Sequence, residues 1–314
     1  EHADVVIENF RPGVMKRLGL DYERLAAIRP ELVYASSNGY GTGTSWEKRR
    51  AYAPVIGAET GLIKSQGDAR DGQYFNDRHS HADVYTALEL TVAVLAALNH
   101  RHTTGRGQQV EVTMAQTMLY VNEHTHDALW DEPVPEGVIR SFQPGDYQVL
   151  ELGDGSSVIV SGHPAEGGTF EFFMQAIGRE DAIGDPRFAD IASRRKNLAD
   201  INQMLADHAK TIPDAVAYEE ILSQHNLAVG QLRTVREFAE SEWSAETGAI
   251  VEVSDRGDGV VKIPQAPWRF SDGADVGIHG TPRYRGEDNE TVLSELLGLD
   301  SATLHQLEEN GVLS

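Results

Sequence analysis

The stretch from Asp77 to Met114 constrains the fold of this chain more than any other part of its 314 residues. Between Val84 and Leu98 the polar residues are Thr86, Glu89 and Thr91, and apolar residues recur every three or four positions. This spacing is typical of an α-helix, and the scarcity of polar residues predicts burial on most of its circumference. After the helix, a glycine-containing turn leads into alternating apolar and polar residues, which predict a strand ending near Met114.

The first forty residues predict a strand, helix, strand order. Val5-Val6-Ile7 is a β-branched run suited to a buried parallel strand. A helix that begins near Asp21 stops before Pro30, and Leu32 to Ala35 follows as a second strand. Short links between these elements imply a parallel crossover, so we expect an α/β fold with a Rossmann-like parallel sheet. Ligands of such sheets bind beyond the carboxyl ends of the strands.

Patterns along the chain predict a large domain and a smaller one. Residues 1–130 carry the predicted parallel sheet, and residues 131–144 are polar and proline-rich, as expected of an interdomain linker. Residues 145–248 predict a smaller α+β domain, because a hairpin signal around Gly153-Asp154-Gly155 precedes several helices. A second hairpin and the last helices follow in residues 249–314.

Charge and composition exclude several classes of partner. Lys and Arg number 27 against 49 Asp and Glu, a formal net charge of −22. So acidic a chain argues against nucleic acid and anionic membrane as partners, although a few Arg residues can still form a local anion site. With no Cys there is neither a disulfide framework nor a thiol nucleophile. No uninterrupted apolar run approaches the roughly 20 residues of a membrane helix, so we expect a cytoplasmic protein.

Asp83 stands where the long helix is predicted to begin. Its carboxylate can accept hydrogen bonds from the first backbone N–H groups and lies at the positive end of the helix dipole. On spacing alone, a capping role is the commoner one for such a residue. The two roles are compatible, because an ionised carboxylate at a partly buried helix start is also available as a nucleophile.

Several motifs, in the same order along the chain, resemble those of one enzyme family. They are ADVVIENFRPGVMKRLGLDYERLAAIRPELVYASSNGYG from Ala3, TGRGQQVEVTM, GDPRFA, RRKN and RGEDNETVLSELLGLD. Together they span nearly the whole chain, and the chain is identified as a member of the class III CoA-transferases. This family includes formyl-CoA and carnitine CoA-transferases and the related alpha-methylacyl-CoA racemases.

The resemblance implies an enzyme that moves CoA from an acyl-CoA donor to a carboxylic acid through a covalent intermediate on Asp83. Coenzyme A is then substrate and product, and we expect no cofactor and no metal. The resemblance further implies an interlocked homodimer in which residues 249–314 return to the large domain. In the family, a further N-terminal segment that contributes to the CoA site precedes the position of Glu1, and we expect it either in a longer protein of which this sequence is a part or on another polypeptide. Where formyl-CoA transferases carry a run of glycines, this chain has GVIRSFQPGDY at 137–147, so the resemblance implies the chemistry of the family but does not by itself assign formyl or oxalyl substrates.

The resemblance also assigns residues to the site. At matching positions the family contacts CoA, so we expect Phe10 to pack on its adenine, Asn9 to hydrogen-bond it and Arg17 to pair with phosphate. Without the family resemblance, the sequence would favour a core role for Phe10, a turn role for Asn9 and a solvent-exposed position for Arg17.

A second group of residues is expected around the acyl group. Gly39 and Tyr40 belong to a loop that a ligand can approach closely. Arg50, next to Arg49, is a candidate for holding CoA phosphates or an acceptor carboxylate. Tyr52 stands near the position of a catalytic His in the racemases.

Two alternative functions remain open at this stage. An acyl-CoA racemase on the same fold would use Asp83 as an acid and base. Racemisation needs two groups that exchange a proton on opposite faces of a carbon, and Tyr52, with an ordinary pKa of about 10, suits this poorly. The other alternative is an inactive CoA-binding or dimerisation fragment.

Overall fold

The computed structural model describes residues 2–122, 125, 129, 147–273, 276–278 and 280–313. The chain divides into two compact units, Glu1–Val134 and Pro135–Ser314. The predicted linker 131–144 lies outside the described residues. The return of residues 249–314 to the large domain stays a prediction.

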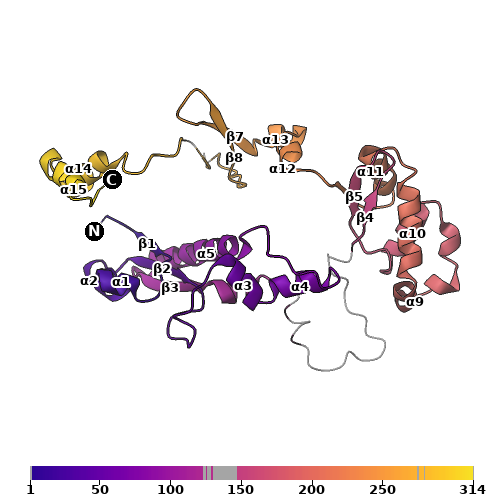
Figure 1. Ribbon diagram of the computed structural model, residues 1–314, viewed down its shortest axis with the longest axis horizontal. Helices are drawn as coiled ribbons and strands as arrows, with labels where there is room; N and C mark the ends of the chain where they lie inside the picture. The colour runs from indigo at the N-terminus through magenta and orange to yellow at the C-terminus, as the bar shows by residue number, and fades with distance from the viewer. Residues whose placement is uncertain are drawn as a thin grey trace. The chain divides into compact units, whose positions relative to one another are not determined.

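The first unit is built on a parallel sheet with strand order β1-β2-β3 (Figure 1). Both neighbouring pairs are parallel, with Val5 opposite Val33 and Val33 opposite Gln108. The strands are β1 (Val5–Glu8), β2 (Val33–Asn38) and β3 (Gln108–Thr113). The helices of this unit are α1 (Val14–Leu18), α2 (Tyr22–Ile28), α3 (Ala53–Glu59), α4 (Leu62–Asp68), α5 (His81–Thr104) and α6 (Met114–Tyr120). The predicted α/β fold with a parallel sheet is confirmed.

Helix α5 packs along the sheet with one face. Leu90 and Val94 form a buried cluster with Ala35 of the central strand, and the buried residues of the helix are Ala82, Thr86, Leu90, Val94 and Ala97. The prediction that most of the circumference of this helix is buried is wrong for the single chain. On the other side of the helix, four apolar side chains are more than half exposed: Val84, Leu88, Val92 and Leu95. By length and composition α5 could also cross a membrane, a criterion that core helices of globular proteins meet as well.

The start of α5 differs from the sequence prediction, and its end agrees with the predicted glycine-containing turn. The helix begins at His81 with Ser80 as its N-cap residue, so Asp83 is the third helical residue and not the cap. At the other end Gly105 adopts φ 71° and donates its N–H to the Arg101 carbonyl, a left-handed ending that favours glycine. A Cβ atom on Gly107 would lie 2.0 Å from the carbonyl oxygen of Leu32, so this glycine permits close contact with the strand beside it.

The second unit contains a three-stranded antiparallel sheet in the order β4-β5-β6. Its strands are β4 (Val149–Glu151), β5 (Ser157–Val160) and β6 (Val229–Gln231), and the pairing of β4 with β5 confirms the first predicted hairpin. The helices packed with them are α8 (Thr169–Ala176), α9 (Ile191–Lys196), α10 (Leu198–Ala209) and α11 (Ala215–Ser223), with short 3₁₀ turns at η2 (Glu180–Ala182) and η3 (Pro186–Phe188). Phe170, Phe173 and Tyr218 are fully buried in the core between sheet and helices.

The remaining elements of the second unit confirm the other predicted hairpin. Strands β7 (Ile250–Ser254) and β8 (Val260–Pro264) pair antiparallel. The helices are α12 (Val235–Ala239), α13 (Glu242–Thr247), α14 (Asn289–Leu297) and α15 (Ser301–Glu309). Arg256, in the hairpin turn, pairs with Glu287 and lies 4.2 Å from the ring centroid of Tyr284, which ties the turn to the segment before α14.

Candidate active site

A cavity of about 650 Å³ opens in the first unit where the three parallel strands end. Asn9 and Phe10 follow β1, Gly39 follows β2 and Met114 follows β3, and all four line the cavity. Carboxyl ends of parallel strands are the usual ligand site of open α/β sheets. The cavity is therefore where the fold itself favours a bound substrate.

Asp83 lines this cavity from the first turn of α5. A carboxylate in a first helical turn is favoured by the positive end of the helix dipole. Among the described residues, none donates a hydrogen bond to its oxygens, so they remain available to a ligand. The side chain is exposed, whereas the sequence predicts partial burial, because within the described part of this chain nothing covers that side of the helix start.

The first turn of α5 is anchored by Asp77. Its carboxylate accepts hydrogen bonds from the His79 N–H, at 3.1 Å, and from the ring of His81. Burial by itself raises the pKa of Asp77, but these two hydrogen bonds outweigh it and lower the pKa below its usual value. The His81 ring also stacks on Tyr85, with centroids 5.5 Å apart. Asp77 and His81 thus hold the backbone two residues before Asp83.

Five of the predicted site residues come together around the cavity: Asp83, Asn9, Phe10, Gly39 and Tyr52. Phe10 and Tyr52 are 52% and 64% exposed, so their rings are accessible to a ligand and are not core packing residues. The other three predicted residues, Arg17, Arg50 and Tyr40, do not line the cavity.

Arg49 lines the cavity where the sequence singled out its neighbour Arg50. The Arg49 guanidinium lies 4.1 Å from the ring centroid of Trp46 and 5.2 Å from that of Tyr40, and it pairs with Glu59. Tyr40 therefore belongs to the support of Arg49. The sequence signal for Arg49 is Trp46 three residues earlier, whose carbonyl accepts the Arg49 N–H at 2.8 Å.

Asn38 is a residue of the cavity lining that the sequence reasoning missed, and Glu111 is its hydrogen-bond partner. Asn38 lines the cavity, and its Nδ2 donates to Glu111 Oε1 at 2.7 Å. The same carboxylate accepts the Thr42 N–H at 3.1 Å and the Thr42 hydroxyl. Asn38 and Glu111 are 73 positions apart in the sequence, so no local pattern could have joined them.

With this geometry established, comparison with known proteins identifies the family. The profile described as CoA-transferase family III matches residues 1–289. The chain belongs to CoA-transferase family III. The prediction that it is a class III CoA-transferase is confirmed.

Relatives of this CoA-transferase include enzymes with stated substrates. It is 29% identical over 329 residues to a formyl-CoA:oxalate CoA-transferase of Streptomyces avermitilis, covering 99% of this chain and 78% of the relative. It is 28% identical to an acetyl-CoA:oxalate CoA-transferase of Acetobacter aceti, covering 86% of this chain and 67% of the relative. A crystal structure of a CAIB/BAIF family protein from Brucella suis superposes with a TM-score of 0.74 at 27% identity, covering 94% of this chain and 75% of that one.

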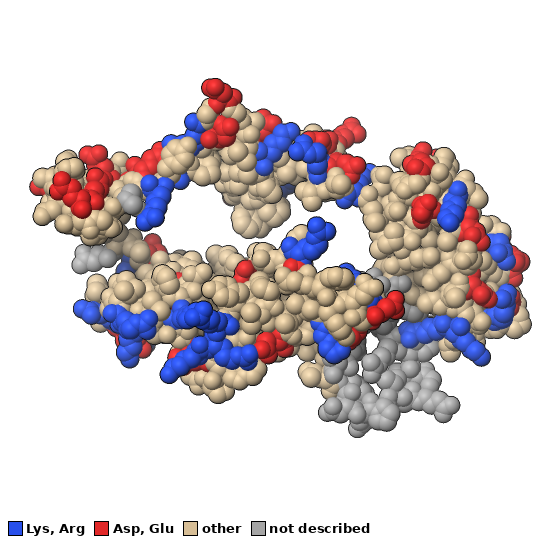
Figure 2. All heavy atoms as spheres, viewed as in Figure 1, with Lys and Arg blue, Asp and Glu red and all other residues tan. Residues whose placement is uncertain are grey.

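Charges around the site of this CoA-transferase are of both signs. Glu8 and Glu47 line the cavity with Asp83, and each accepts a backbone N–H at 2.9 Å, from Phe10 and Gly43 respectively. Figure 2 shows basic side chains gathered over α1 and α2, the helices that carry Lys16, Arg17 and Arg24. In the part of the chain that the structure describes, no three His, Asp or Glu side chains are grouped to hold a metal ion.

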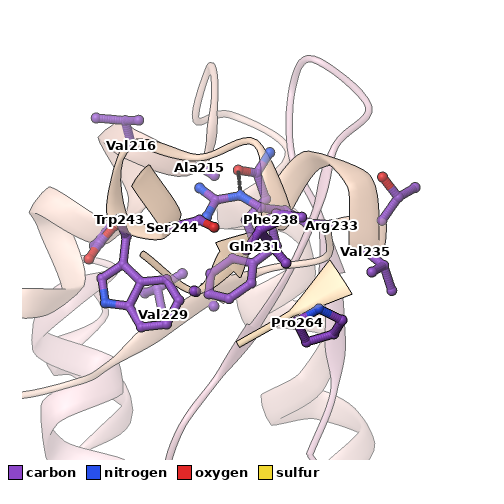
Figure 3. A pocket seen from close by; sticks show the side chains of 16 residues that line it. Ala215, Val216, Val229, Gln231, Arg233, Val235, Phe238, Trp243, Ser244 and Pro264 are labelled. Carbon is purple, nitrogen blue, oxygen red and sulfur yellow. Dashed lines mark hydrogen bonds between the residues drawn. The ribbon is translucent and has the colours of Figure 1, made fainter. Parts of the chain in front are cut away.

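A second cavity, of about 740 Å³, lies in the other unit (Figure 3). Phe238 and Trp243 stack beside it with ring centroids 5.1 Å apart, and Arg233 Nε donates to Gln231 Oε1 at 3.2 Å. Although this cavity is larger, its lining includes none of the residues predicted for the site. The cavity that holds Asp83 is therefore the candidate active site.

Proposed function

We propose that this chain transfers CoA from an acyl-CoA to a small carboxylic acid through a covalent intermediate on Asp83. The observation that carries the proposal is the position of Asp83 in the cavity at the strand ends, together with Asn9 and Phe10. Both positions match family residues that contact CoA. The availability of the Asp83 oxygens supports its role as the nucleophile.

The reaction proceeds as a series of acyl exchanges. An Asp83 oxygen attacks the donor thioester carbonyl, the C–S bond breaks, and an acyl-aspartyl anhydride and CoA thiolate are formed. The thiolate then attacks the aspartyl carbonyl and expels the donor acid as a carboxylate, which leaves a thioester between CoA and Asp83. The acceptor carboxylate attacks this thioester, and the same steps run in reverse. No net proton is gained or lost, and the thioester energy is conserved.

CoA binding is assigned to residues at and near the rim of the cavity. The exposed ring of Phe10 packs on the adenine and Asn9 hydrogen-bonds it. Arg17, with the other basic residues of α1 and α2, pairs with phosphates, because guanidinium groups match phosphate geometry. Arg49, which lines the cavity, and its neighbour Arg50 provide further positive charge, and Tyr52 and Gly39 border the acyl group.

Exclusion of water is required, because hydrolysis of either acyl intermediate would waste the thioester. Asp83 is exposed in the single chain, and the apolar residues Val84, Leu88, Val92 and Leu95 beside it on α5 are uncovered. The proposal therefore includes a homodimer, in which a second copy buries this surface and closes the site. Analytical ultracentrifugation would measure the oligomeric state.

The acceptor acid is proposed only as a class. Two of the relatives are named as CoA-transferases that use oxalate, and small carboxylates are therefore the first acids to test. The segment that replaces the family's glycine run, GVIRSFQPGDY, lies outside the described residues except for Tyr147. A screen of acyl-CoA donors against oxalate, succinate and monocarboxylates would identify the pair.

Isotope transfer tests the covalent step. With an ¹⁸O-labelled acceptor acid, one ¹⁸O should pass to the Asp83 carboxylate, which mass spectrometry of the peptide would detect. Asp83→Ala and Asp83→Asn should abolish transfer and retain CoA binding by calorimetry. Glu89→Gln, on the same helix but outside the cavity, is the matched control and should retain activity.

Two outcomes would contradict the proposal. Transfer by Asp83→Ala at a substantial fraction of the wild-type rate would exclude Asp83 as the nucleophile. Exchange of the α-hydrogen of an acyl-CoA in D₂O, without CoA transfer, would indicate the racemase alternative. A transferase has no step that removes this hydrogen.

A further inference from the structure

Helix α5 runs antiparallel to the strands of the parallel sheet. Near its C-terminal end, Arg101 Nη1 donates to Asp4 Oδ1 at 3.2 Å and to the Glu31 carbonyl at 3.4 Å, and these two residues precede β1 and β2. The first turns of the helix therefore lie at the opposite edge of the sheet, where the strands end and the cavity opens. A step towards the end of a strand is thus a step along α5 towards Asp83.

Ser37 lies on the side of the sheet that faces α5. Two positions earlier on β2, Ala35 forms a buried cluster with Leu90 of α5, and side chains two positions apart on a strand share one face. The residue opposite Ser37 on β3, Val112, packs against the same cluster. The neighbouring Ser36 is on the other face and does not line the cavity, whereas Ser37 does.

The depth of Ser37 in the cavity follows from the spacing of strand and helix. At a rise of about 3.3 Å per residue, Ser37 lies about 6.6 Å beyond Ala35 towards the strand end. The same distance along α5 is about four residues at a rise of about 1.5 Å each, which leads from Leu90 to Thr86. Ser37 is thus level with Thr86, about one helical turn deeper than Asp83, and all three residues line the cavity.

The two hydroxyl groups at this level differ in their hydrogen bonds. Thr86 is buried and donates its hydroxyl to the Ala82 carbonyl at 2.6 Å, a bond within the helix. Ser37 is only partly buried, and among the residues that the structure describes its hydroxyl has no hydrogen-bond partner. Ala87 and Leu90 line the cavity from the same face of α5. Ser37 therefore offers a polar contact to a ligand beside an apolar wall.

We propose that Ser37 is a specificity-determining residue, whose hydroxyl binds a hydroxyl or keto oxygen on the acyl group of the substrate. This inference rests on the proposed function, in which Phe10 and Asn9 hold CoA at the rim and the thioester carbon meets Asp83. The acyl group then extends to the inner side, where an oxygen on its second or third carbon comes within hydrogen-bonding distance of Ser37. A hydroxyl both donates and accepts, so either group fits, whereas a second carboxylate would be repelled by Asp83.

Pairs of donors that differ in one hydroxyl test this contact. The probes are 2- and 3-hydroxybutyryl-CoA, each compared with butyryl-CoA in the CoA-exchange assay. A neutral hydrogen bond contributes a factor of up to about 10, so wild-type kcat/KM should favour at least one hydroxylated donor by about 5- to 10-fold. Ser37→Ala should reduce kcat/KM for that donor by the same factor relative to butyryl-CoA, and the change should lie in KM, because the contact exists in the ground state.

Ser36→Ala is the matched control. It removes the same hydroxyl from the adjacent residue, which is buried on the other face of the sheet and outside the cavity lining. The ratio of kcat/KM between hydroxylated donor and butyryl-CoA should therefore stay at the wild-type value. A loss of the preference in Ser36→Ala as well would show that the effect comes from the strand and not from a contact with Ser37.

Binding measurements separate failure of this inference from failure of the proposed function. Calorimetry of each donor with the wild type and Ser37→Ala detects the contact without turnover, and the dissociation constants should show the same difference between donors. An equal change for both donors, or no preference in the wild type, would overturn the role of Ser37. Absence of CoA transfer from every donor, with the binding difference present, would instead contradict the proposed function.

Discussion

Gly39 and Ala51 approach each other so closely at the cavity that one pair of substitutions tests the geometry of the site. Both residues line the cavity, and a Cβ atom on Gly39 would lie 2.2 Å from the Cβ of Ala51. Ordinary contacts begin at 3.4 Å, so the Gly39→Ala methyl overlaps Ala51 by more than 1 Å. The next nearest atoms, Ala51 Cα and Ile56 Cδ1, are 3.6 and 4.0 Å away, which are ordinary contacts. The clash therefore comes from one methyl group.

The cost can be worked from this overlap. Overpacking of a well-packed region typically costs about 1–3 kcal/mol in the free energy of unfolding. For a chain of this size each kcal/mol lowers the melting temperature by roughly 2–4 °C, so Gly39→Ala should lower it by roughly 2–12 °C. Ala51→Gly alone loses about 0.5–1 kcal/mol, because glycine is more flexible in the unfolded chain. In the double variant the overlapping methyl is gone, so stability should return to within about 1 kcal/mol of the wild type.

Urea unfolding and the CoA-exchange assay would measure both consequences. Gly39→Ala should also reduce transfer, because the strained atoms border the acyl site, and Ala51→Gly should restore it in the double variant. The reasoning is refuted if Gly39→Ala is as stable as the wild type. It is equally refuted if the two substitutions simply add, because their coupling is the signature of a direct contact.

Two further predictions concern stability. Gly107→Ala should destabilise the first unit by about 1–3 kcal/mol, because the new Cβ would meet the Leu32 carbonyl oxygen at 2.0 Å. Gly57→Ala, inside α3 with its nearest contact at 3.7 Å, should instead stabilise the unit by about 0.5–1 kcal/mol in urea unfolding. Equal changes in stability for Gly107→Ala and Gly57→Ala would contradict the close contact at Gly107. Hydrogen bonding to Arg256 lowers the pKa of Glu287 to about 2. The ionised Glu287 therefore stabilises the fold fully at pH values above its unfolded-state pKa near 4.5, and this stabilisation is lost as the pH falls through 2. The melting temperature of Glu287→Gln should therefore vary less than that of the wild type between pH 5 and 2, and parallel curves would show that Glu287 does not contribute.

Long-range contacts account for what sequence reasoning missed at the site. Arg49 and Arg50 are adjacent and chemically identical, and the choice between them depends on Trp46, Tyr40 and Glu59 placing one guanidinium at the cavity. Asn38 resembled any polar residue at the end of a strand until the register of β2 on β3 brought Glu111 beside it.

The sequence by itself determined the elements and five of the residues that line the cavity. Periodicity and β-branched runs act over a few residues, so they predicted the parallel α/β layer, both hairpins and the long helix. Because parallel strands end at one edge of a sheet, the positions of Asn9, Phe10 and Gly39 also followed. The tertiary structure decided which face of α5 is buried, that Asp83 lies inside the helix and not at its cap, and which polar side chains meet. Such pairings depend on strand register and on the packing of distant segments, and no local pattern in the chain encodes them.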